Sequence, residues 1–576
     1  MILQALTQLY EDLVSQGKIA RPGWSATKIS YALCLDLAGN LTQIVPVLEE
    51  VQRGKKTVLA PTIMRLPAAV KRTAGVNSNF LWDNATYLLG LDSKGKPDRA
   101  MECFRDCERK HKEILGNCDV PEAKAILRFF ETWIPESAVE NPFVSEITED
   151  LSKGGNLTFR INSCYAYEVP EIAESWDAYY NVSDGIQGQC LITGKTDTIE
   201  SVHPSISGVR GAQSSGAAIV SFNAPAFCSY GKEQSNNAPI GKYAAFAYTS
   251  ALNYLLADRN TVQYIGDSAI VCWAEGAEEA YQQFAMSALF GSAVQQNMTD
   301  ADLQAMLRRL AQGLPCEEQA LDPARTFYVL GLSPNAARLS VRFFLKDSFG
   351  NIMRNVSEHY ERLEMIGYFE GQPSRKSPWY LLQETVNKNA KDKDPSPVLA
   401  GAIMRSILSG EMYPAALIEA VMLRIRAEHN ITAGRAAIIK AYYLRNPNPQ
   451  VPKEVLTVGL NEQSSNIPYN LGRMFSVLEN IQMTANPGIN ATIKDKYFNS
   501  AASTPATIFP LLQKLSQSHL RKLDVGKRIY LEKQLQDIAG TLSETLPARL
   551  SLPEQGSFYL GYYHQTQKRY EKKENK

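Results

Sequence analysis

The sequence predicts an α+β protein in which a mixed α/β N-terminal part precedes a mainly helical middle region and a C-terminal helical bundle. Two observations predict this class. Short apolar runs bounded by Gly, Asn and Pro alternate with helical patterns up to about residue 280, whereas helical periodicity dominates afterwards. A chain of 576 residues is also too long for one hydrophobic core, so several domains are expected.

The first half of the chain supplies the expected strands and several helices. The segment "ISYALCLDLAGNLTQIVPV" is typical of a hairpin that turns at Gly39-Asn40. Pro61 and Pro67 should break up the segment that follows. The other elements expected here are a helix over 1–16, helices within 98–134, a strand in "NLTFRINSCYAYEV", a hairpin over 189–199 turning at Gly194, a strand over Ala217–Ala224, a helix over Lys242–Ala257 and a strand in "SAIVCWA".

The second half is expected to be helical, with one interruption. "TFYVLGLSPNAARLSVRFFLK" predicts two strands around a Ser333-Pro334-Asn335 turn, and "NPNPQVPKE" (446–454) has the composition of a linker. Four amphipathic helices are expected after it: Tyr469–Thr484, Thr492–Ala502, Thr507–Leu520 and Gly526–Leu542. We therefore predict three domains, over 1–280, 281–450 and 451–576.

Composition restricts the class of protein. With 44% hydrophobic and 21% charged residues, the chain should fold as a soluble globular protein. The N-terminus "MILQALTQLYEDLVSQGK" carries acidic residues and predicts an amphipathic helix rather than a signal peptide. No apolar stretch approaches the ~18 residues of a membrane span. Nine cysteines without framework spacing fit a reducing cytosol, so we expect a cytoplasmic protein.

Charge is balanced overall but unevenly distributed. The net charge is zero, yet the window from Val51 to Trp82 contains no Asp or Glu, and from Lys453 onward 16 Lys/Arg stand against 11 Asp/Glu. Phosphate contacts need local positive charge, not a basic protein as a whole. The alternative is that such segments are ordinary solvated faces. The cations of the first window are Arg53, Lys55, Lys56, Arg65, Lys71 and Arg72.

Sequences that resemble catalytic motifs fail on inspection. "GQCLITGKT" (188–196) has one residue too many for a phosphate-binding loop and contains strand-forming residues. "AQSSG" (212–216) resembles a nucleophile elbow, but the residues after it predict a strand instead of the required helix, and His203 alone is weak support for a base. We find no HExxH sequence and no recognisable pair of carboxylates.

A possible zinc set lies within the first helical region. Cys103, Cys107, His111 and Cys118 form C-x3-C-x3-H-x6-C, whose first three members share one helical face. Zinc ligands usually occur in closer pairs, so packing in the core is the favoured interpretation. We expect no catalytic residue, no metal and no cofactor: the chain should bind and not catalyse.

Neutral hydrogen-bonding side chains crowd the stretch "RGAQSSGAAIVSFNAPAFCSYGKEQSNNAP" (210–239). Gln, Asn and Ser both donate and accept, and Asn and Gln recognise adenine edges. Arg210, Lys232 and Lys242 could contact phosphates. The stretch suits selective contact with a nucleic-acid groove, a polar protein interface, or a network that holds loops in place. A second polar tip, "GVNSN" (75–79), precedes apolar residues that should anchor it.

Several long blocks closely resemble one family. The stretch just quoted, followed by "AAFAYTSALNYLL", resembles the large subunit of the type I-C CRISPR surveillance complex, Cascade. The resemblance extends over nearly the whole chain, through "NFLWDNATYLLG", "LGLSPNAARLSVRFF", "RAAIIKAYYLRN", "LGRMFSVLENIQ", "INATIKDKYFNSAASTPATIFP" and "EQGSFYLGYYHQ".

This resemblance implies a function. Family members belong to a ribonucleoprotein that carries a guide RNA, recognise a short protospacer-adjacent motif (PAM) in double-stranded DNA, help to open the duplex and support recruitment of a helicase-nuclease. The implied partners are the backbone, crRNA-end-capping and small helical subunits, the target DNA and that effector. A separately translated small subunit is also implied, starting near Met474, or near Val455 or Val458 from a non-Met codon. The rival interpretations are a nuclease and a scaffold that does not recognise DNA.

The resemblance also orders the candidate residues, because loops of the N-terminal domain contact the motif in related subunits and a wedge-like element separates the strands. We expect Asn84 and Asn253 to be structural. The candidates for motif recognition are Lys71, Arg72, Asn77, Asn79, Gln213, Ser214, Ser215, Asn223, Lys232, Gln234, Asn236 and Asn237. The candidates for phosphate contact are Arg53, Lys55, Lys56, Arg65, Arg210 and Lys242.

Overall fold

The chain divides into two compact units. Unit 1 comprises Met1–Pro204 and Phe222–Ala251, and unit 2 comprises Ser205–Ser221 and Leu252–Lys576. The computed structural model describes residues 1–53, 56–70, 75–92, 95–181, 185–222, 224–258, 262–291, 300–317, 320–367, 377–391 and 393–570. The predicted α+β class is confirmed. The predicted domain limits near 280 and 450 do not coincide with the two units, and the three-domain organisation remains a prediction.

The described residues of unit 1 form three small sheets flanked by helices. Its helices are α1 (Ile2–Ser15), α2 (Ala85–Leu88), α3 (Pro97–Leu115), α4 (Pro121–Thr132), α5 (Pro142–Ser145), α6 (Thr148–Lys153) and α7 (Pro170–Asn181), and α8 (Lys242–Ala257) begins in it. Its strands are β1 (Trp24–Ile29), β2 (Tyr31–Leu35), β3 (Leu41–Pro46), β4 (Leu48–Arg53), β5 (Lys56–Pro67), β6 (Trp82–Asn84), β7 (Asn156–Ile161), β8 (Cys164–Tyr165), β9 (Gln187–Gln189) and β10 (Thr196–Thr198).

The central sheet of unit 1 has the order β3-β2-β7-β6, with β8 paired to β7. Strands β2 and β7 run parallel, and the other pairs are antiparallel. Helices α3, α4 and α7 cover this sheet with a shared apolar core that includes Phe104, Ile126, Phe129, Phe159 and Trp176. The predicted hairpins at Gly39 and Gly194 are both confirmed, with positive φ at each glycine.

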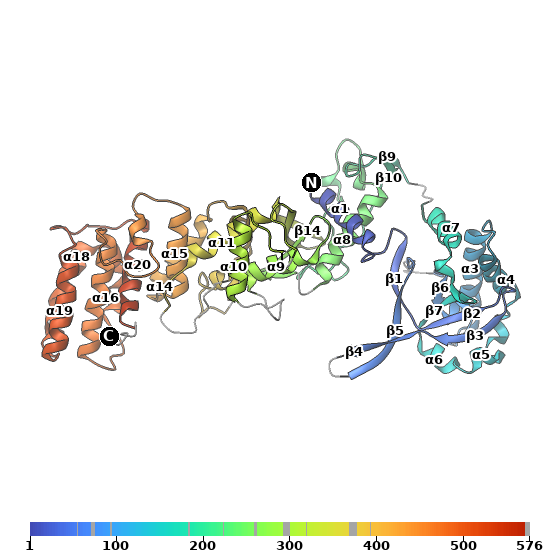
Figure 1. Ribbon diagram of the computed structural model, residues 1–576, viewed down its shortest axis with the longest axis horizontal. Coiled ribbons are helices and arrows are strands. Elements are labelled where there is room, and N and C mark those ends of the chain that lie inside the picture. The colour runs from blue at the N-terminus through green and yellow to red at the C-terminus, as the bar shows by residue number, and fades with distance from the viewer. Residues whose placement is uncertain are drawn as a thin grey trace. The chain divides into compact units, whose positions relative to one another are not determined.

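Strand β5 is longer than the sequence predicts, because Pro61 does not break it. The N-terminal half of β5 pairs with β4 and its C-terminal half with β1, so the three strands form the order β1-β5-β4. Pro61 lies at the change of partner, opposite Leu48, and the next residue, Thr62, lies opposite Ile29. A missing N–H is tolerated where one ladder ends and another begins. Figure 1 shows β4 and β5 as a long hairpin.

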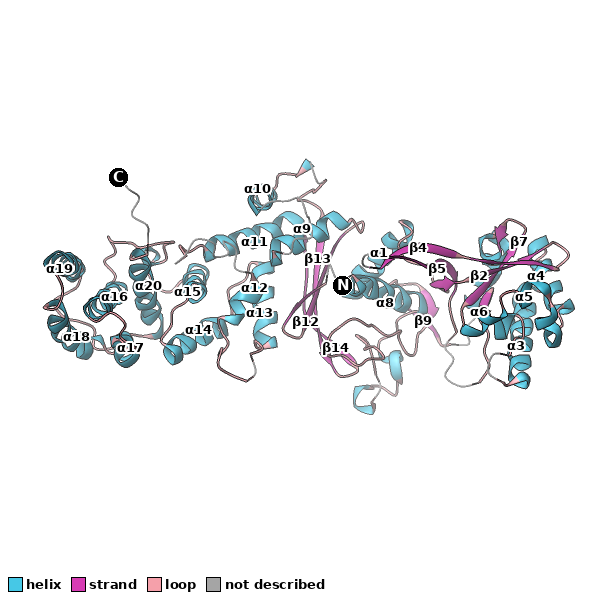
Figure 2. Cartoon of the chain, turned by 90° about the horizontal axis from the view of Figure 1, so that it is seen from below, coloured by secondary structure: helices cyan, strands magenta, loops and turns pink. Residues whose placement is uncertain are grey.

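Unit 2 begins with a four-stranded antiparallel sheet of order β11-β12-β13-β14 and continues as helices (Figure 2). Its strands are β11 (Gln263–Ile265), β12 (Ser268–Ala274), β13 (Thr326–Asn335) and β14 (Arg338–Ser348). Its helices are α9 (Glu279–Phe290), α10 (Asp300–Ala311), α11 (Phe349–Leu363), α12 (Pro378–Gln383), α13 (Pro397–Ser409), α14 (Ala415–Glu428), α15 (Ala433–Arg445), α16 (Ile467–Ala485), α17 (Ile493–Ser503), α18 (Pro505–Leu520), α19 (Val525–Ala539) and α20 (Leu552–Lys568).

Short 3-10 segments complete the described structure. They span Pro135–Glu140, Ala166–Glu168, Pro225–Phe227, Gln234–Asn237 and Lys453–Val455. Among the described residues, no helix combines the length and the apolar character that crossing a membrane requires.

Two predicted elements are wrong in detail. Ala217–Ala224 is not a strand in the described residues: Ala217 and Ala218 form only isolated bridges, to Ile206 and Arg338. The β13–β14 turn lies at Ala336-Ala337, because Asn335 already pairs with Arg338. Ala-Ala is not a typical turn sequence, whereas the neighbouring Ser-Pro-Asn is, so the sequence placed the turn too early.

The 446–454 segment does not separate two cores. One apolar core in unit 2 runs from Ile265 to Tyr563 and includes residues on both sides of that segment. Helices α15, α16 and α20 lie side by side (Figures 1 and 2), and Gly556 of α20 faces the Tyr443 ring of α15. Helix α20 was not predicted from the sequence, because its run of Tyr, Gly and Gln shows no clear apolar stripe.

Helices α16 and α20 approach each other closely at two glycines. A Cβ on Gly472 would overlap the carbonyl oxygen of Phe558, and one on Gly561 would overlap that of Tyr469. Around this contact, the Tyr469 hydroxyl lies 2.8 Å from His564 Nδ1 and Arg473 Nε donates to Gln565 Oε1 at 3.2 Å. The close backbone approach brings these buried polar groups within hydrogen-bonding distance of one another.

Gly472→Ala should therefore destabilise unit 2. We expect the free energy of unfolding to fall by about 3 kcal/mol or more, because the helices must separate and their buried hydrogen bonds lengthen. Gly526→Ala is the control: it lies in α19, its Cβ would meet only Asp524 Oδ1 at 3.5 Å, and stability should stay equal or rise slightly. Urea unfolding followed by far-UV circular dichroism measures both. Equal midpoints for the two variants would contradict the close contact.

Candidate nucleic-acid interface

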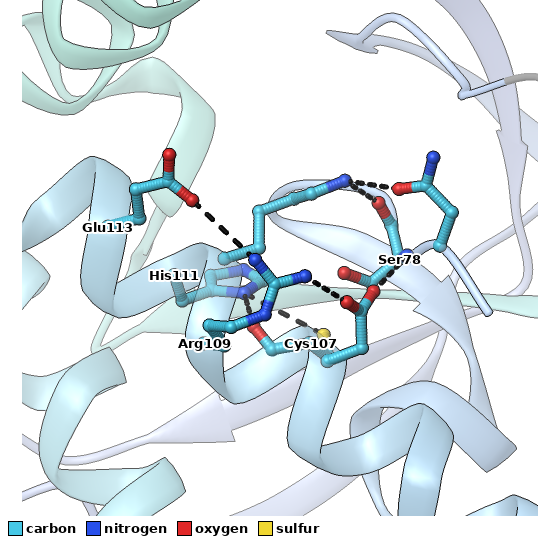
Figure 3. A network of polar contacts seen from close by, with 8 residues as sticks. Ser78, Cys107, Arg109, His111 and Glu113 are labelled. Atoms are coloured by element: carbon cyan, nitrogen blue, oxygen red, sulfur yellow. Dashed lines mark hydrogen bonds and ion pairs between the residues drawn. The ribbon is translucent and has the colours of Figure 1, made fainter.

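Side chains of helix α3 form hydrogen bonds with the 75–81 loop. The buried Lys110 ammonium donates to Asn77 Oδ1 at 2.8 Å and to the carbonyl of Ser78. The Ser78 N–H donates to Asp106 Oδ2 at 2.7 Å. Figure 3 shows this network, with Ser78 facing the side chains of α3. A cation and an anion spaced four residues apart on one helical face thus bind a carbonyl and an amide of the same loop residue.

The electrostatics of α3 suit this anchoring. Burial acts to raise the pKa of Asp106, but hydrogen bonds from Ser78 and Arg109 outweigh it and hold the pKa below its ordinary value. Arg109 is exposed, pairs with Asp106 and lies 3.9 Å from Glu113 (Figure 3). Asp106 therefore stays charged at neutral pH and can accept from both groups.

His111 fixes the end of the loop. Its Nδ1–H donates to the carbonyl of Cys107 at 2.7 Å, and its Nε2 accepts from the N–H of Leu81 at 3.0 Å. Leu81 has a φ of 63°, an uncommon backbone conformation for Leu that this hydrogen bond helps to maintain. Burial lowers the pKa of His111 to about 4, so the ring is neutral at pH 7 and keeps the tautomer that both contacts require.

The two asparagines of the loop differ. Asn79 is only 4% exposed, and its Oδ1 accepts from the N–H of Val70 at 3.0 Å. Its own N–H donates to Asp83 Oδ2 at 2.9 Å. Asn77 is exposed at the surface while Lys110 binds its Oδ1. The burial of Asn79 favours a structural role for it, and Asn77 is the asparagine of this loop that can meet a ligand.

The polar stretch 210–239 is divided between the two units. Gln213, Ser214 and Ser215 are exposed in a turn of unit 2. This turn lies beside the β13–β14 turn, because the Gln213 N–H donates to the carbonyl of Ala336 at 3.4 Å. Arg210 is exposed there too, with its guanidinium 4.0 Å from the Tyr264 ring centroid. A cation supported on a ring can still contact phosphates.

The rest of the stretch belongs to unit 1. Asn237 is used within its own loop: its Oδ1 accepts from Ser229 N–H at 2.8 Å and its Nδ2 donates to the carbonyls of Lys232 and Gln234. Lys232 and Gln234 are exposed and Asn236 is partly buried. The sequence therefore predicted one polar patch where the structure has two, one in each unit.

Three of the six phosphate candidates and three of the motif-recognition candidates lie outside the described side chains. Lys55, Lys71, Arg72 and Asn223 fall outside the described residues, as do the side chains of Arg53 and Lys56. Arg65 is exposed on β5. Lys242 donates to the carbonyl of Tyr180 at 2.8 Å and lies 4.2 Å from the Tyr180 ring centroid, in a pocket that also contains Asp177 and Asp197. That mixed charge makes Lys242 a weaker phosphate candidate.

A comparison with protein families decides the relationship. The family described as CRISPR-associated protein (Cas_Csd1) matches residues 6–570. The chain belongs to the Cas_Csd1 family. The resemblance to the type I-C Cascade large subunit is thereby confirmed. The comparison with curated proteins finds no significant match.

The segments that resemble catalytic motifs have other roles in this Cas_Csd1 protein. Residues 188–196 form the β9–β10 hairpin. Ser214 lies in a turn of unit 2, whereas His203 belongs to unit 1 and lies 2.7 Å from the Tyr248 hydroxyl. Cys103, Cys107 and His111 are buried, as the packing interpretation predicted. Both nitrogens of His111 already bind backbone groups, which does not fit a metal ligand.

The sequence did not reveal the α3 residues that anchor the 75–81 loop, but it predicted the structural roles of two asparagines. Asp106, Lys110 and His111 recur within one helical face, but a mixed charged face is more often solvated, so nothing marked them as partners of a loop more than twenty residues earlier. The structural roles predicted for Asn84 and Asn253 are confirmed. Asn84 Oδ1 caps α2 by accepting from Thr86 N–H, and Asn253 Oδ1 accepts from Ser207 N–H at 2.9 Å.

The buried neutral His111 predicts a pH dependence of stability. Its folded pKa of about 4 lies below the unfolded value of about 6.5, so its contribution is complete above pH 6.5 and is lost as the pH falls toward 4. Between pH 7 and pH 5 this one group should cost about 2 kcal/mol.

The test compares wild type with His111→Gln by urea unfolding at pH 7 and pH 5. The variant should be less stable at pH 7 but lose about 2 kcal/mol less on acidification. An identical loss in both proteins would show that His111 does not titrate on unfolding.

Proposed function

We propose that this Cas_Csd1 chain is the non-catalytic large subunit of a crRNA-guided type I-C Cascade. In this proposal it recognises the PAM in double-stranded DNA, helps duplex unwinding and R-loop formation, and supports recruitment of the helicase-nuclease in antiviral defence. Its partners are the backbone and crRNA-end-capping subunits, the small helical subunits and target DNA, in the cytoplasm. The family match over residues 6–570 supports this assignment.

One observation carries the DNA-recognition part of the proposal: an exposed asparagine held by a buried lysine. In guided complexes, base pairing recognises the long sequence and the protein needs only a few contacts to the short flank. An Asn side chain discriminates adenine when its carbonyl and amide ends are both oriented. Lys110 orients Asn77 before DNA arrives, because its ammonium donates to Asn77 Oδ1. Such preorganisation reduces the entropy lost on binding.

The β4–β5 hairpin is the candidate element for opening the duplex. Side chains at alternate positions of a strand share one face, and on β5 this face carries Leu59, 67% exposed, and Ile63, 58% exposed. Arg65 continues the same face, and Lys28 of β1 lies opposite Ile63. Exposed apolar side chains beside cations suit insertion between base steps with contact to the neighbouring phosphates.

A purely structural scaffold is the alternative. It is favoured by exposed apolar side chains on α18 and α19, which suit contact with other protein subunits. Val525 is 73% exposed and Ile529 is 59% exposed. A scaffold would hold guide RNA and subunits together without discriminating the flank.

The two functions separate when flank preference is measured in the complex assembled with guide RNA and partner subunits. We compare the affinity for matched duplex DNA with and without the correct flank. Asn77→Ala should reduce this preference about tenfold, since one bidentate base contact contributes about 1–3 kcal/mol of discrimination. Asn79 is not substituted. Because it is buried, its substitution could disturb the structure, and loss of recognition could not be told apart from loss of folding.

Gln213→Ala tests the rival candidate site, since it removes an exposed polar side chain from unit 2. It should assemble and keep the flank preference. If Gln213→Ala loses the preference and Asn77→Ala does not, the unit 2 turn recognises the flank. If wild-type complex binds both duplexes equally, the scaffold alternative is correct.

A further inference from the structure

A pocket of about 550 Å³ in unit 2 has no role in the function proposed above. Its walls come from α12, the α14–α15 connection, α16, α17 and α20. This volume lies within the range of about 300–1,000 Å³ that is typical of small-molecule sites. The buried Ile431 and Ala433 contribute apolar wall, and polar groups converge from three helices.

Lys494 is the most informative group of the pocket. Its ammonium lies 4.8 Å from the Tyr562 ring centroid and 5.8 Å from that of Phe498. In the part of the chain that the structure describes, this ammonium makes no hydrogen bond and no ion pair within 4.0 Å. Burial lowers the pKa of Lys494, and neighbouring Glu479 opposes that effect only in part. A partly buried ammonium that contacts aromatic rings can still donate hydrogen bonds to an anion.

The carboxylates of the pocket are already used. Glu479 Oε2 accepts from the Tyr562 hydroxyl at 2.6 Å and Oε1 accepts from the Thr492 hydroxyl at 2.9 Å. Glu384 lies 3.4 Å from the guanidinium of the buried Arg435. Glu384 therefore pairs with Arg435, while Glu479 partly offsets the effect of burial on Lys494, so the basic side of the pocket depends on its other cations as well.

Arg569 and Lys388 add to that basic side. Both line the pocket, and Arg569 is oriented because its Nη2 donates to the carbonyl of Ser476 at 2.6 Å. A guanidinium has five N–H donors, so this contact leaves others for an anion. Phosphate suits a site that combines an oriented guanidinium with a partly desolvated ammonium.

Aromatic side chains occupy the remaining wall. Tyr380, Tyr562 and Tyr570 line the pocket together with Met483. A nucleic-acid base stacks on such rings with little regard for its identity. Phosphate-binding cations and stacking rings in one pocket of this volume fit one nucleotide.

We propose that this pocket binds a single nucleotide unit, with its phosphate at Lys494 and Arg569 and its base against the tyrosine rings. The unit is either a free mononucleotide or one residue of a single strand. This inference does not depend on recognition of the flank by Asn77, which lies in unit 1.

Titration calorimetry of the full chain with AMP tests the proposal. We expect AMP to bind, and Lys494→Gln to weaken binding at least tenfold. Lys494→Arg keeps the charge and should restore most of the affinity. Lys496→Gln is the control, because it removes a cation from the same helix but from an exposed position outside the pocket lining. It should change affinity less than twofold.

Three further probes show which parts of the nucleotide are required and whether it comes from a free nucleotide or a strand. Adenosine and inorganic phosphate should each bind more weakly than AMP, since each fills half of the site. A single-stranded dA5 oligonucleotide distinguishes a strand from a free nucleotide: if only dA5 binds and Lys494→Gln weakens it, a strand occupies the pocket. Absence of binding by both AMP and dA5, or equal affinities for Lys494→Gln and Lys496→Gln, would overturn the proposal.

Discussion

The contact between α3 and the 75–81 loop is the constraint on which the DNA-recognition account depends. Lys110, Asp106 and His111 bind this loop through its backbone at Ser78 and Leu81, so the loop conformation does not rely on its own short polar sequence. Lys110 and His111 are buried and Asp106 is partly buried, so leaving their polar groups without partners would be costly. Without the loop, Lys110 would lose two acceptors and His111 would lose the N–H of Leu81, and this cost keeps the loop in place and Asn77 oriented.

Buried polar groups fix the position of the backbone elsewhere in the molecule too. Apolar packing alone would not determine how these segments align. In unit 2, Arg473 and His564 join α16 to α20 at a contact that only glycines permit. Lys494 differs, because its ammonium faces rings and not a hydrogen-bonding partner. Buried polar groups that have hydrogen-bond partners stabilise the structure. A partly buried cation that still has donors available indicates a binding site for a ligand.

Local sequence patterns predicted much of the fold but little of the site. Hairpins at Gly39 and Gly194 and the long helices were predictable, because turn chemistry and periodicity are local. The pairing of β12 with β13 joins strands that the sequence placed in different domains, and Pro61 is tolerated only because β5 changes partners there. Asn77 and Asn79 look alike in sequence. Only tertiary contacts bury one and expose the other.

The central claim is that Lys110 acts on DNA recognition through Asn77. A double-mutant cycle of flank preference in the assembled complex, with Asn77→Ala, Lys110→Met and both together, tests it most directly. The account predicts that each single change lowers the preference and that the double variant loses little more than Asn77→Ala alone. Lys112→Met, an exposed change on the same helix, should have no effect. Additive losses, or an unchanged preference in Lys110→Met, would contradict the claim.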